Sequence, residues 1–354
     1  MHWPYLVGAA ASLLLLFCHL IYVATICLSC WSERSKNEVL FYQTKDPSDK
    51  KKAAEVEKKF VNVEILNDSE NSKKCGWLGA CLTGGFLGSQ MLNYASIYGI
   101  ARANNKSAFF PSYRSQDLQQ TFINLTLPLF KPEECPCEVL NSSQFQRMNG
   151  GGMQFQQSLL EMPCQKNVLL SEVLNYEYFR DYIAEVRPQF RFSRDILIPC
   201  IETLAFATLS YENCTTIGIH LRRGDFTLPS KMEYGHQPAR DDLIATAVKY
   251  FENRLKNTSK CLVFIALGND DDWNFKQAPK QDNVVVLKPT SAAVDFCILA
   301  HCNHSAISAG SFGFMAALLA NGITVYQKEQ ARPNSNLGGQ IDIQHYMPKE
   351  WIPI

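Results

Sequence analysis

The sequence lacks several features that would point directly to a function. Its 34 basic and 34 acidic side chains cancel, and a formal net charge of zero argues against a general binder of nucleic acids or other polyanions. It has neither the Gly-Lys-Ser/Thr phosphate loop of P-loop proteins nor the Gly-x-Ser-x-Gly elbow of serine hydrolases. No internal repeat of fixed period is present. Any recognition of phosphate must therefore come from local groups of basic residues.

Charge is also absent from residues 4–30, where an apolar stretch runs from Leu6 to Ile26. About 20 apolar residues span a bilayer, whereas a cleaved signal peptide has a shorter apolar region behind a basic segment. The sequence therefore predicts an uncleaved transmembrane anchor at 5–30, preceded by a cytoplasmic tail at 1–4. A cleaved signal peptide is the alternative.

The signals for the orientation of the anchor conflict with one another. Arg34 and Lys36 would place the C-terminal side in the cytosol by the positive-inside rule. Ten of the 13 cysteines follow the anchor, and an even number of cysteines can pair fully in an oxidising lumen. Asn-x-Ser/Thr glycosylation sequons also follow it, at Asn67, Asn105, Asn124, Asn141, Asn213, Asn257 and Asn303. We expect a luminal C-terminal side; the alternative is a cytosolic protein with small buried cysteines.

Residues 31–74 form a segment of different composition. Lysine pairs and triplets alternate with glutamates, and large apolar side chains are few. Such a segment cannot bury enough apolar surface to fold alone. It is predicted to be a stem that holds the following domains away from the membrane.

The folded part is predicted to begin at residue 75 with a strand at 77–82, a glycine-rich turn at 83–90 and a helix over 91–100. A strand at 107–110 and a helix at 177–190 follow. Strand, turn, helix and strand are typical of the start of an α/β domain. The glycine-rich turn is weak evidence for a nucleotide, because close backbone packing also requires glycine.

The second half alternates strands and helices more regularly. The predicted strands are 216–221, 261–267, 283–287, 305–308 and a final one at 323–326, and the predicted helices are 240–256, 294–301 and one starting at Ser311. Such alternation indicates mostly parallel sheets covered by helices on both faces. We therefore predict an α/β protein with two Rossmann-like domains, at 75–210 and 211–354, facing a cleft.

The most informative motif is His-Leu-Arg-Arg-Gly-Asp at 220–225. It ends an apolar strand, and ligands bind at the carboxyl ends of strands in open α/β sheets. Guanidinium groups match the geometry of phosphate oxygens, so the motif predicts a diphosphate site with a carboxylate beside it. The alternative is a surface ion-pair site. Adjacent strand residues point to opposite faces, so one of the two arginines could be structural.

Three other patterns could carry chemistry. Residues 308–318 place small residues before a helix whose N-terminus could bind an anion or be an ordinary cap, with Ser311 able to cap it. The acidic run at 270–272 resembles a metal-binding Asp-x-Asp motif, but an N-cap or solvated loop is favoured. The Cys-Pro-Cys at 135–137 favours a disulfide, and His-Cys-Asn-His at 301–304 lacks matching zinc ligands.

Together, three motifs resemble the α-1,2-fucosyltransferase family. Residues 220–226 resemble its His-x-Arg-Arg-x-Asp motif, 301–326 its C-terminal motif, and 85–95 its Gly-x-Leu-Gly-Asn-Gln block. The sequence departs from the family at Ser89, where Asn is usual, and at Met315, where an aromatic residue is usual.

The resemblance implies two Rossmann-like domains in the GT-B arrangement, with GDP-fucose as donor, no metal or other cofactor, and inversion at the fucose anomeric carbon. It also implies a type II Golgi membrane enzyme that acts on β-galactoside-terminated glycans of glycoproteins or glycolipids, with a homodimer left open. The alternatives are a metal-dependent glycosyltransferase that uses the acidic run, and a non-catalytic glycan-binding relative.

The expected site residues divide into two groups. On the donor side are His220, Arg222, Arg223, Asp295, Ser311, Phe312 and Gly313; on the acceptor side or in the cleft are Gly88 and Gln90. Arg222 and Arg223 are expected to stabilise the charge on the leaving diphosphate. Asp225 is the candidate general base, or it orients the arginine pair. No residue is expected to bind a metal.

Overall fold

The computed structural model describes residues 74–80, 85–111, 115–130, 145–164, 166–211 and 213–354. The predicted anchor and nearly all of the predicted stem lie outside these ranges, as do Asn67, Asn141 and the Cys-Pro-Cys sequence. Across the ranges given above, no helix has both the length and the apolar character needed to cross a membrane.

Contacts along the chain divide the described residues into two units. Residues 74–200 and 214–354 form one compact unit, which contains both β-sheets. Residues 201–213 belong to the other unit and contain the second half of helix α7 (Arg194–Ala207). The predicted domain boundary at 210/211 falls between α7 and the next strand, and it stays a prediction.

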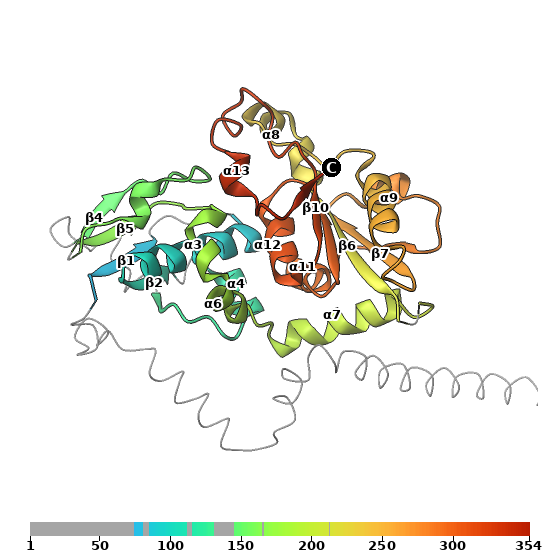
Figure 1. Ribbon diagram of the computed structural model, residues 1–354, viewed down its shortest axis with the longest axis horizontal. Helices are drawn as coiled ribbons and strands as arrows, with labels where there is room; N and C mark the ends of the chain where they lie inside the picture. The colour runs from blue at the N-terminus through green and yellow to red at the C-terminus, as the bar shows by residue number, and fades with distance from the viewer. Residues whose placement is uncertain (1–73, 81–84, 112–114, 131–144, 165, 212) are drawn as a thin grey trace, which may run out of the picture. The chain divides into compact units, whose positions relative to one another are not determined.

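The first sheet has five parallel strands in the order β3-β2-β1-β5-β4 (Figure 1). Its strands are β1 (Trp77–Ala80), β2 (Ser107–Pro111), β3 (Leu129–Phe130), β4 (Phe145–Met148) and β5 (Asn167–Leu170). Helix α3 (Leu87–Ala103) connects β1 to β2, and helices α4 (Gln116–Thr121) and α6 (Ile183–Val186) are short. Leu92, Tyr94 and Ile97 on α3 are fully buried, which explains its stable position against the sheet.

The second sheet has six parallel strands in the order β11-β10-β9-β6-β7-β8. These are β6 (Thr215–Leu221), β7 (Leu262–Gly268), β8 (Val284–Val286), β9 (His304–Ile307), β10 (Thr324–Tyr326) and β11 (Ile352–Pro353). The helices are α8 (Pro229–Tyr234), α9 (Leu243–Leu255), α10 (Asp271–Gln277), α11 (Ala292–Ala300), α12 (Ser311–Ala320) and α13 (Ile343–Tyr346). The prediction of two parallel α/β halves is confirmed.

Strand β6 lies at the centre of the second sheet and is buried on both faces. Ile217, Ile219 and Leu221 alternate along it and pack in one cluster with α9 residues such as Phe251. The intervening residues point to the other face of the sheet. There, a Cβ atom at Gly218 would lie 3.2 Å from the Sγ atom of Cys302, a residue just after α11. This alternation directs the side chain of the next such residue, His220, toward α12.

Two predicted elements are wrong. The predicted helix at 177–190 is a series of 3₁₀ turns with one short α-helical turn, α6. Neighbouring aromatic residues here, Tyr178 and Phe179, are both buried, which a helix with one buried stripe does not allow. The strand at 324–326 is not the last, because β11 pairs with it at the sheet edge. Pro353 fits an edge strand, since it has no N–H to donate.

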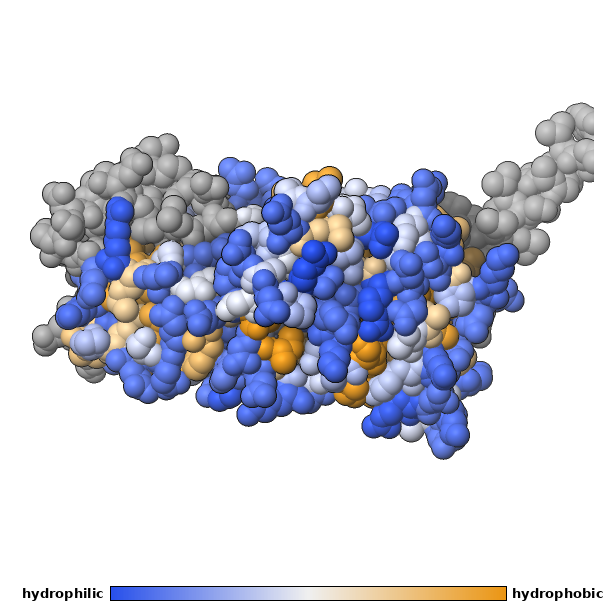
Figure 2. All heavy atoms as spheres, turned by 90° about the horizontal axis from the view of Figure 1, so that it is seen from above, coloured by the Kyte–Doolittle hydropathy of each residue, from blue (hydrophilic) through white to orange (hydrophobic). Residues whose placement is uncertain are grey.

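The face of the molecule seen in Figure 2 is mainly hydrophilic. Figure 2 shows apolar residues in small groups separated by hydrophilic ones on the face that is turned to the viewer. Such an exterior is usual for a folded domain in water, in which single exposed apolar residues are common.

Candidate active site

Three strands of the second sheet bring polar residues together at their carboxyl ends. The arginine pair follows β6, Asn269 follows β7, and Ser308 follows β9. The Arg222 backbone N–H donates to Ser308 Oγ at 2.7 Å, and the Arg223 backbone N–H donates to Asn269 Oδ1 at 2.8 Å. Both neighbouring loops therefore fix the backbone of the arginine pair, at the edge where parallel sheets bind ligands.

The Arg222 side chain is held by a carboxylate and an aromatic ring. Its Nη2 atom donates to Asp225 Oδ2 at 3.0 Å, and its guanidinium carbon lies 5.0 Å from the centre of the Phe226 ring. The side chain is still partly exposed. A planar cation held in place and open to solvent is suited to bind an anion with little loss of side-chain entropy.

Arg223 belongs to a different network. Its Nε lies 3.4 Å from Asp270 Oδ2 and its Nη1 lies 3.8 Å from Asp241 Oδ1, while its guanidinium carbon lies 4.4 Å from the Trp273 ring centre. Two carboxylates already compensate the charge of Arg223, whereas Arg222 has one. Of the two arginines, Arg222 is the better placed to bind a diphosphate.

Asp225 forms an ion pair with Arg222. Asp225 Oδ1 lies 2.8 Å from Arg222 Nη2, but the N–H bonds of Nη2 do not point toward it. Oδ1 therefore accepts no hydrogen bond from any described residue. Because Oδ1 is buried, an acceptor hydroxyl could reach only Oδ2, which already accepts from Arg222. This geometry favours an orienting role for Asp225, and its role as general base stays a prediction.

His220 is buried at the end of β6. Its ring stacks on Phe312 with 5.3 Å between centres, and its Nδ1 lies 3.5 Å from Ser308 Oγ. A Cβ atom at Gly313 would overlap the His220 ring, so the third residue of α12 must be glycine for this packing. Burial, aided by the charge of Arg222, lowers the pKa of His220 to about 3. The imidazole is therefore neutral at physiological pH and can donate one N–H.

The depressed pKa of His220 gives a pH-dependent stability. Because an unfolded histidine titrates near pH 6.5, the unfolded chain binds the proton first, and stability should fall as the pH drops below about 6.5. Between pH 6.5 and 5 this one group should remove about 2 kcal/mol from the free energy of unfolding. Urea unfolding at both pH values should show a smaller loss in His220→Asn than in the wild type. An identical loss in the two proteins would mean that His220 is protonated in the fold.

The N-terminus of α12 lies against the first turn of α3. Gly310 is the N-cap of α12 with φ of 109°, a conformation that favours glycine. The prediction that Ser311 caps the helix is wrong: Ser311 is its first residue, and its Oγ lies 3.0 Å from Ser89 Oγ. A Cβ atom at Gly88 would overlap the backbone of Phe312. The first backbone N–H groups of α12 have no partner within the helix and can bind an anion.

Gln90, predicted for the acceptor side or cleft, is buried near the start of α3. Its Nε2 donates to Asp117 Oδ2 at 3.0 Å and to the Gly85 carbonyl at 3.2 Å. Sequence reasoning missed Asp117, and it also missed the supporting Asn269 and Ser308. Asn269 lies shortly after a predicted strand and Ser308 ends one, which was their only signal. Asp117 had no such signal, because it lies in α4, away from any predicted strand end.

The remaining acidic candidates have local roles. Asp295 Oδ1 accepts from the backbone and hydroxyl of Thr290, both at 3.0 Å, and burial raises the pKa of Asp295. In the described part of the chain it forms no ion pair or hydrogen bond with the arginine pair. In the acidic run, Asp270 accepts from Trp273 N at 3.3 Å as the N-cap of α10. The predicted N-cap role of the run is confirmed.

Cysteine pairing could not be predicted, and the structure gives it for seven cysteines. The disulfides are Cys75–Cys164, Cys200–Cys297 and Cys214–Cys261. Cys302 is unpaired, so the cysteines after the anchor do not all pair. Burial raises the pKa of the Cys302 thiol to about 12, which makes it a weak nucleophile.

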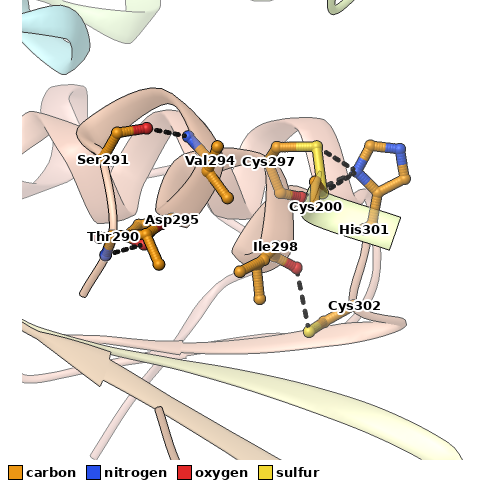
Figure 3. Close-up of a disulfide and its surroundings, with 9 residues drawn as sticks. All are labelled: Cys200, Thr290, Ser291, Val294, Asp295, Cys297, Ile298, His301 and Cys302. Atoms are coloured by element: carbon orange, nitrogen blue, oxygen red, sulfur yellow. Dashed lines mark hydrogen bonds between the residues drawn. A yellow bond between two sulfur atoms is a disulfide. The ribbon is translucent and has the colours of Figure 1, made fainter. Parts of the chain in front are cut away.

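Within the described ranges, one group of side chains has the residue types of a metal site, and it includes the disulfide at α11. This group contains Cys200, Cys297 and His301, and His301 Nδ1 lies 3.4 Å from Cys297 Sγ (Figure 3). Its two sulfur atoms are bonded to each other and cannot act as thiolate ligands. At the other end of α11, Ser291 Oγ accepts from Val294 N.

The described sequons differ in accessibility. Four of the asparagines are exposed, at 105, 124, 213 and 257. Asn303 is not, because its Oδ1 accepts from Thr216 N and Thr216 Oγ1, both at 2.9 Å, and Ser305 of the same sequon is buried. Glycosylation of these five asparagines stays a prediction, and Asn303 is the least accessible of them.

Known proteins resemble most of this chain. Glycosyl transferase family 11 matches residues 73–354. Galactoside alpha-(1,2)-fucosyltransferase 1 of Oryctolagus cuniculus is 24% identical over 309 residues, which cover 83% of this chain and 80% of that protein. Galactoside 2-alpha-L-fucosyltransferase SEC1 of Bos taurus is 25% identical over 275 residues, which cover 76% and 72%.

Two solved structures resemble this chain less closely in sequence than these two relatives do. A variant of Arabidopsis thaliana FUT1 in complex with GDP gives a TM-score of 0.46 at 13% identity, covering 75% of this chain and 72% of that one. The fucosyltransferase NodZ from Bradyrhizobium gives a TM-score of 0.40 at 11% identity, covering 69% and 92%. With TM-scores this low, the fold assignment depends on the two parallel sheets themselves.

Proposed function

The chain belongs to glycosyl transferase family 11, the family of the α-1,2-fucosyltransferases, and we propose that it transfers L-fucose from GDP-fucose to the 2-hydroxyl of a β-linked galactose. The observation that carries this proposal is the position of Arg222 at the carboxyl end of β6, where its backbone N–H donates to Ser308, three residues before α12 begins at Ser311. At about 24% identity, the relatives support the family more strongly than they support the acceptor.

The proposed reaction is a single inverting displacement. The galactose oxygen forms a bond to fucose C1 while the bond from C1 to the diphosphate oxygen breaks, and GDP leaves with the bonding electron pair. Arg222 and the free N–H groups of Ser311, Phe312 and Gly313 stabilise the charge that grows on the diphosphate. His220 orients Phe312 and can donate to a phosphate oxygen. The hydroxyl proton passes to a base near the acceptor.

The role of Asp225 is tested by Asp225→Asn. We propose that its ion pair fixes Arg222, so the variant must order that side chain when the donor binds, at a cost of about 1–2 kcal/mol. The KM for GDP-fucose should rise about tenfold, measured in steady-state assays at saturating acceptor. If kcat falls instead while GDP affinity is unchanged, Asp225 is the general base.

We propose that the reaction needs no metal. Arg222 and the helix N-terminus supply positive charge at the site, and Asp270 is engaged by Arg223 and by the start of α10. Activity should persist in EDTA. Loss of activity in EDTA and its recovery with Mg²⁺ or Mn²⁺ would instead support a metal-dependent enzyme.

We propose a type II protein of the Golgi membrane with its catalytic part in the lumen. The three disulfides support an oxidising compartment, and four exposed sequons are available there. The acceptors would be β-galactoside-terminated glycans on glycoproteins or glycolipids.

The donor is tested by binding measurements on the full-length protein in detergent. Titration calorimetry should detect binding of GDP and GDP-fucose and much weaker binding of UDP-galactose. Transfer of radiolabelled fucose to a panel of β-galactosides then tests for catalysis. Binding of glycans without any transfer would support a non-catalytic relative.

A further inference from the structure

Ser308 places a buried hydroxyl group between two residues of the candidate site. It follows β9 directly, its Oγ accepts the backbone N–H of Arg222 at 2.7 Å, and the same oxygen lies 3.5 Å from His220 Nδ1. A serine hydroxyl has one proton to donate and two lone pairs with which to accept. Because Arg222 already donates to one lone pair, the remaining hydrogen bonding of Ser308 depends on where its proton points.

The surroundings of Ser308 identify the acceptor of this proton. Ser308 is 0% exposed, and among the described residues only His220 Nδ1 is placed to accept from its hydroxyl group. A Cβ atom at Gly313 would overlap Nδ1, so the start of α12 packs closely against this nitrogen. If Nδ1 carried the proton and donated to Ser308 instead, the hydroxyl proton would be buried without an acceptor, which native structures rarely allow. The hydroxyl group of Ser308 therefore donates to Nδ1.

The other ring nitrogen of His220, Nε2, is open to a ligand. Burial lowers the pKa of His220 to about 3, so the ring carries a single proton at neutral pH. The hydrogen bond made by one ring nitrogen decides which of the two is protonated, and with Nδ1 as the acceptor the proton is on Nε2. Nε2 hydrogen-bonds to no described residue, yet it is not one of the fully buried polar atoms without a partner.

We propose that Ser308 is a positioning residue that holds His220 in the tautomer with the proton on Nε2, so that Nε2 donates to a phosphate oxygen of the donor. The second half of this proposal rests on the proposed function. The Arg222 N–H, the Ser308 hydroxyl and the His220 ring then form one chain of hydrogen bonds that ends at the diphosphate. Hydrogen bonds in such a chain polarise and strengthen one another. The opposite tautomer would turn a lone pair toward the phosphate and repel it.

The tautomer is tested by nitrogen NMR of the full-length protein in detergent, with isotope-labelled histidine and without donor. The His220 signals are assigned by their loss in His220→Asn. We expect a protonated Nε2 and an unprotonated Nδ1 in the wild type. Ser308→Ala should move the Nδ1 resonance toward that of a nitrogen without a hydrogen bond and should populate both tautomers. Ser308→Thr keeps the hydroxyl group and should retain the wild-type signals.

Asn269→Ala is the matched control for Ser308→Ala. Asn269 accepts the backbone N–H of Arg223, as Ser308 accepts that of Arg222, but it makes no hydrogen bond to His220. Its replacement should leave both nitrogen resonances of His220 unchanged. A proton on Nδ1 in the wild type, or the same Nδ1 resonance in Ser308→Ala as in the wild type, would overturn the role of Ser308.

Donation to the phosphate is tested by replacing His220 with each of the two amides. The amide nitrogen of glutamine can take the place of Nε2, whereas the shorter side chain of asparagine reaches only the place of Nδ1. The kcat/KM for GDP-fucose should therefore be about tenfold higher in His220→Gln than in His220→Asn, as expected for one hydrogen bond to a charged group. Equal values, or a higher value in His220→Asn, would overturn donation from Nε2.

Failure of the proposed function would be distinguishable from failure of this inference. If the wild type transfers no fucose, the proposed function is wrong, while the NMR signals of the protein without donor still decide the tautomer. The comparison of His220→Gln with His220→Asn is then made on the Kd of GDP from titration calorimetry. A tenfold lower Kd in His220→Gln would support donation from Nε2 to a phosphate, and equal values would overturn it.

Discussion

Replacing Arg222 with alanine should lower kcat/KM for GDP-fucose by about 10²-fold or more. Removing one preordered donor from a site of developing negative charge typically has an effect of this size. The backbone of Arg222 is fixed by Ser308, and its side chain is held by Asp225 and Phe226, so the wild-type guanidinium needs little reorganisation. The other cation at this strand end, Arg223, is similarly exposed but is already paired with two carboxylates.

The matched control for Arg222 is its neighbour. Arg223→Ala removes the same charge one residue away, but that charge is already shared with Asp270 and Asp241. Its kcat/KM should therefore fall less than that of Arg222→Ala, in steady-state assays with varied GDP-fucose. Arg222→Lys should recover only part of the activity, because lysine cannot form a bidentate pair with a phosphate. Near-wild-type turnover in Arg222→Ala would remove the diphosphate assignment.

Replacing Gly88 with alanine should abolish activity and lower the free energy of unfolding by about 1–3 kcal/mol, as expected for an overpacked buried site. The added Cβ would overlap the backbone of Phe312. Backbone cannot move aside as a flexible side chain can, so the first turn of α12 must shift. That shift would displace the N–H groups proposed to bind the diphosphate and the ring that stacks on His220.

Gly339→Ala is the control for this steric argument. A Cβ atom at Gly339 would meet its nearest neighbour at 3.6 Å, an ordinary van der Waals contact. Chemical unfolding and GDP titration of the two variants should separate them clearly. If Gly88→Ala binds GDP and unfolds like Gly339→Ala, then the contact between α3 and α12 does not position the donor site.

The sequence predicted those parts of the site that depend on local patterns. The apolar run at 216–221 identified β6, and the rule for parallel sheets then placed the arginine pair at its carboxyl end. Adjacent strand residues point to opposite faces, which predicted that at least one of the two arginines could be structural, and Arg223 is paired with two carboxylates. The acidic run was correctly expected to cap α10.

Contacts between distant segments could not be predicted. The distance of 3.0 Å between Ser89 and Ser311 joins residues 222 positions apart, and no local periodicity encodes such a pairing. The support of Arg222 by Ser308 depends likewise on the order of strands in the sheet. The cap of α12 at Gly310 depends on its positive φ, which a run of small residues leaves open. These tertiary contacts assemble the site from its local parts.

The most direct test of the central claim is the structure of the product. The full-length protein is incubated with GDP-fucose and methyl β-galactoside in EDTA, and the linkage is determined by two-dimensional NMR. We predict a single product in which fucose is α-linked to the 2-hydroxyl of galactose. A β-linked fucose, attachment at another hydroxyl, or the absence of any transfer would contradict the proposed function.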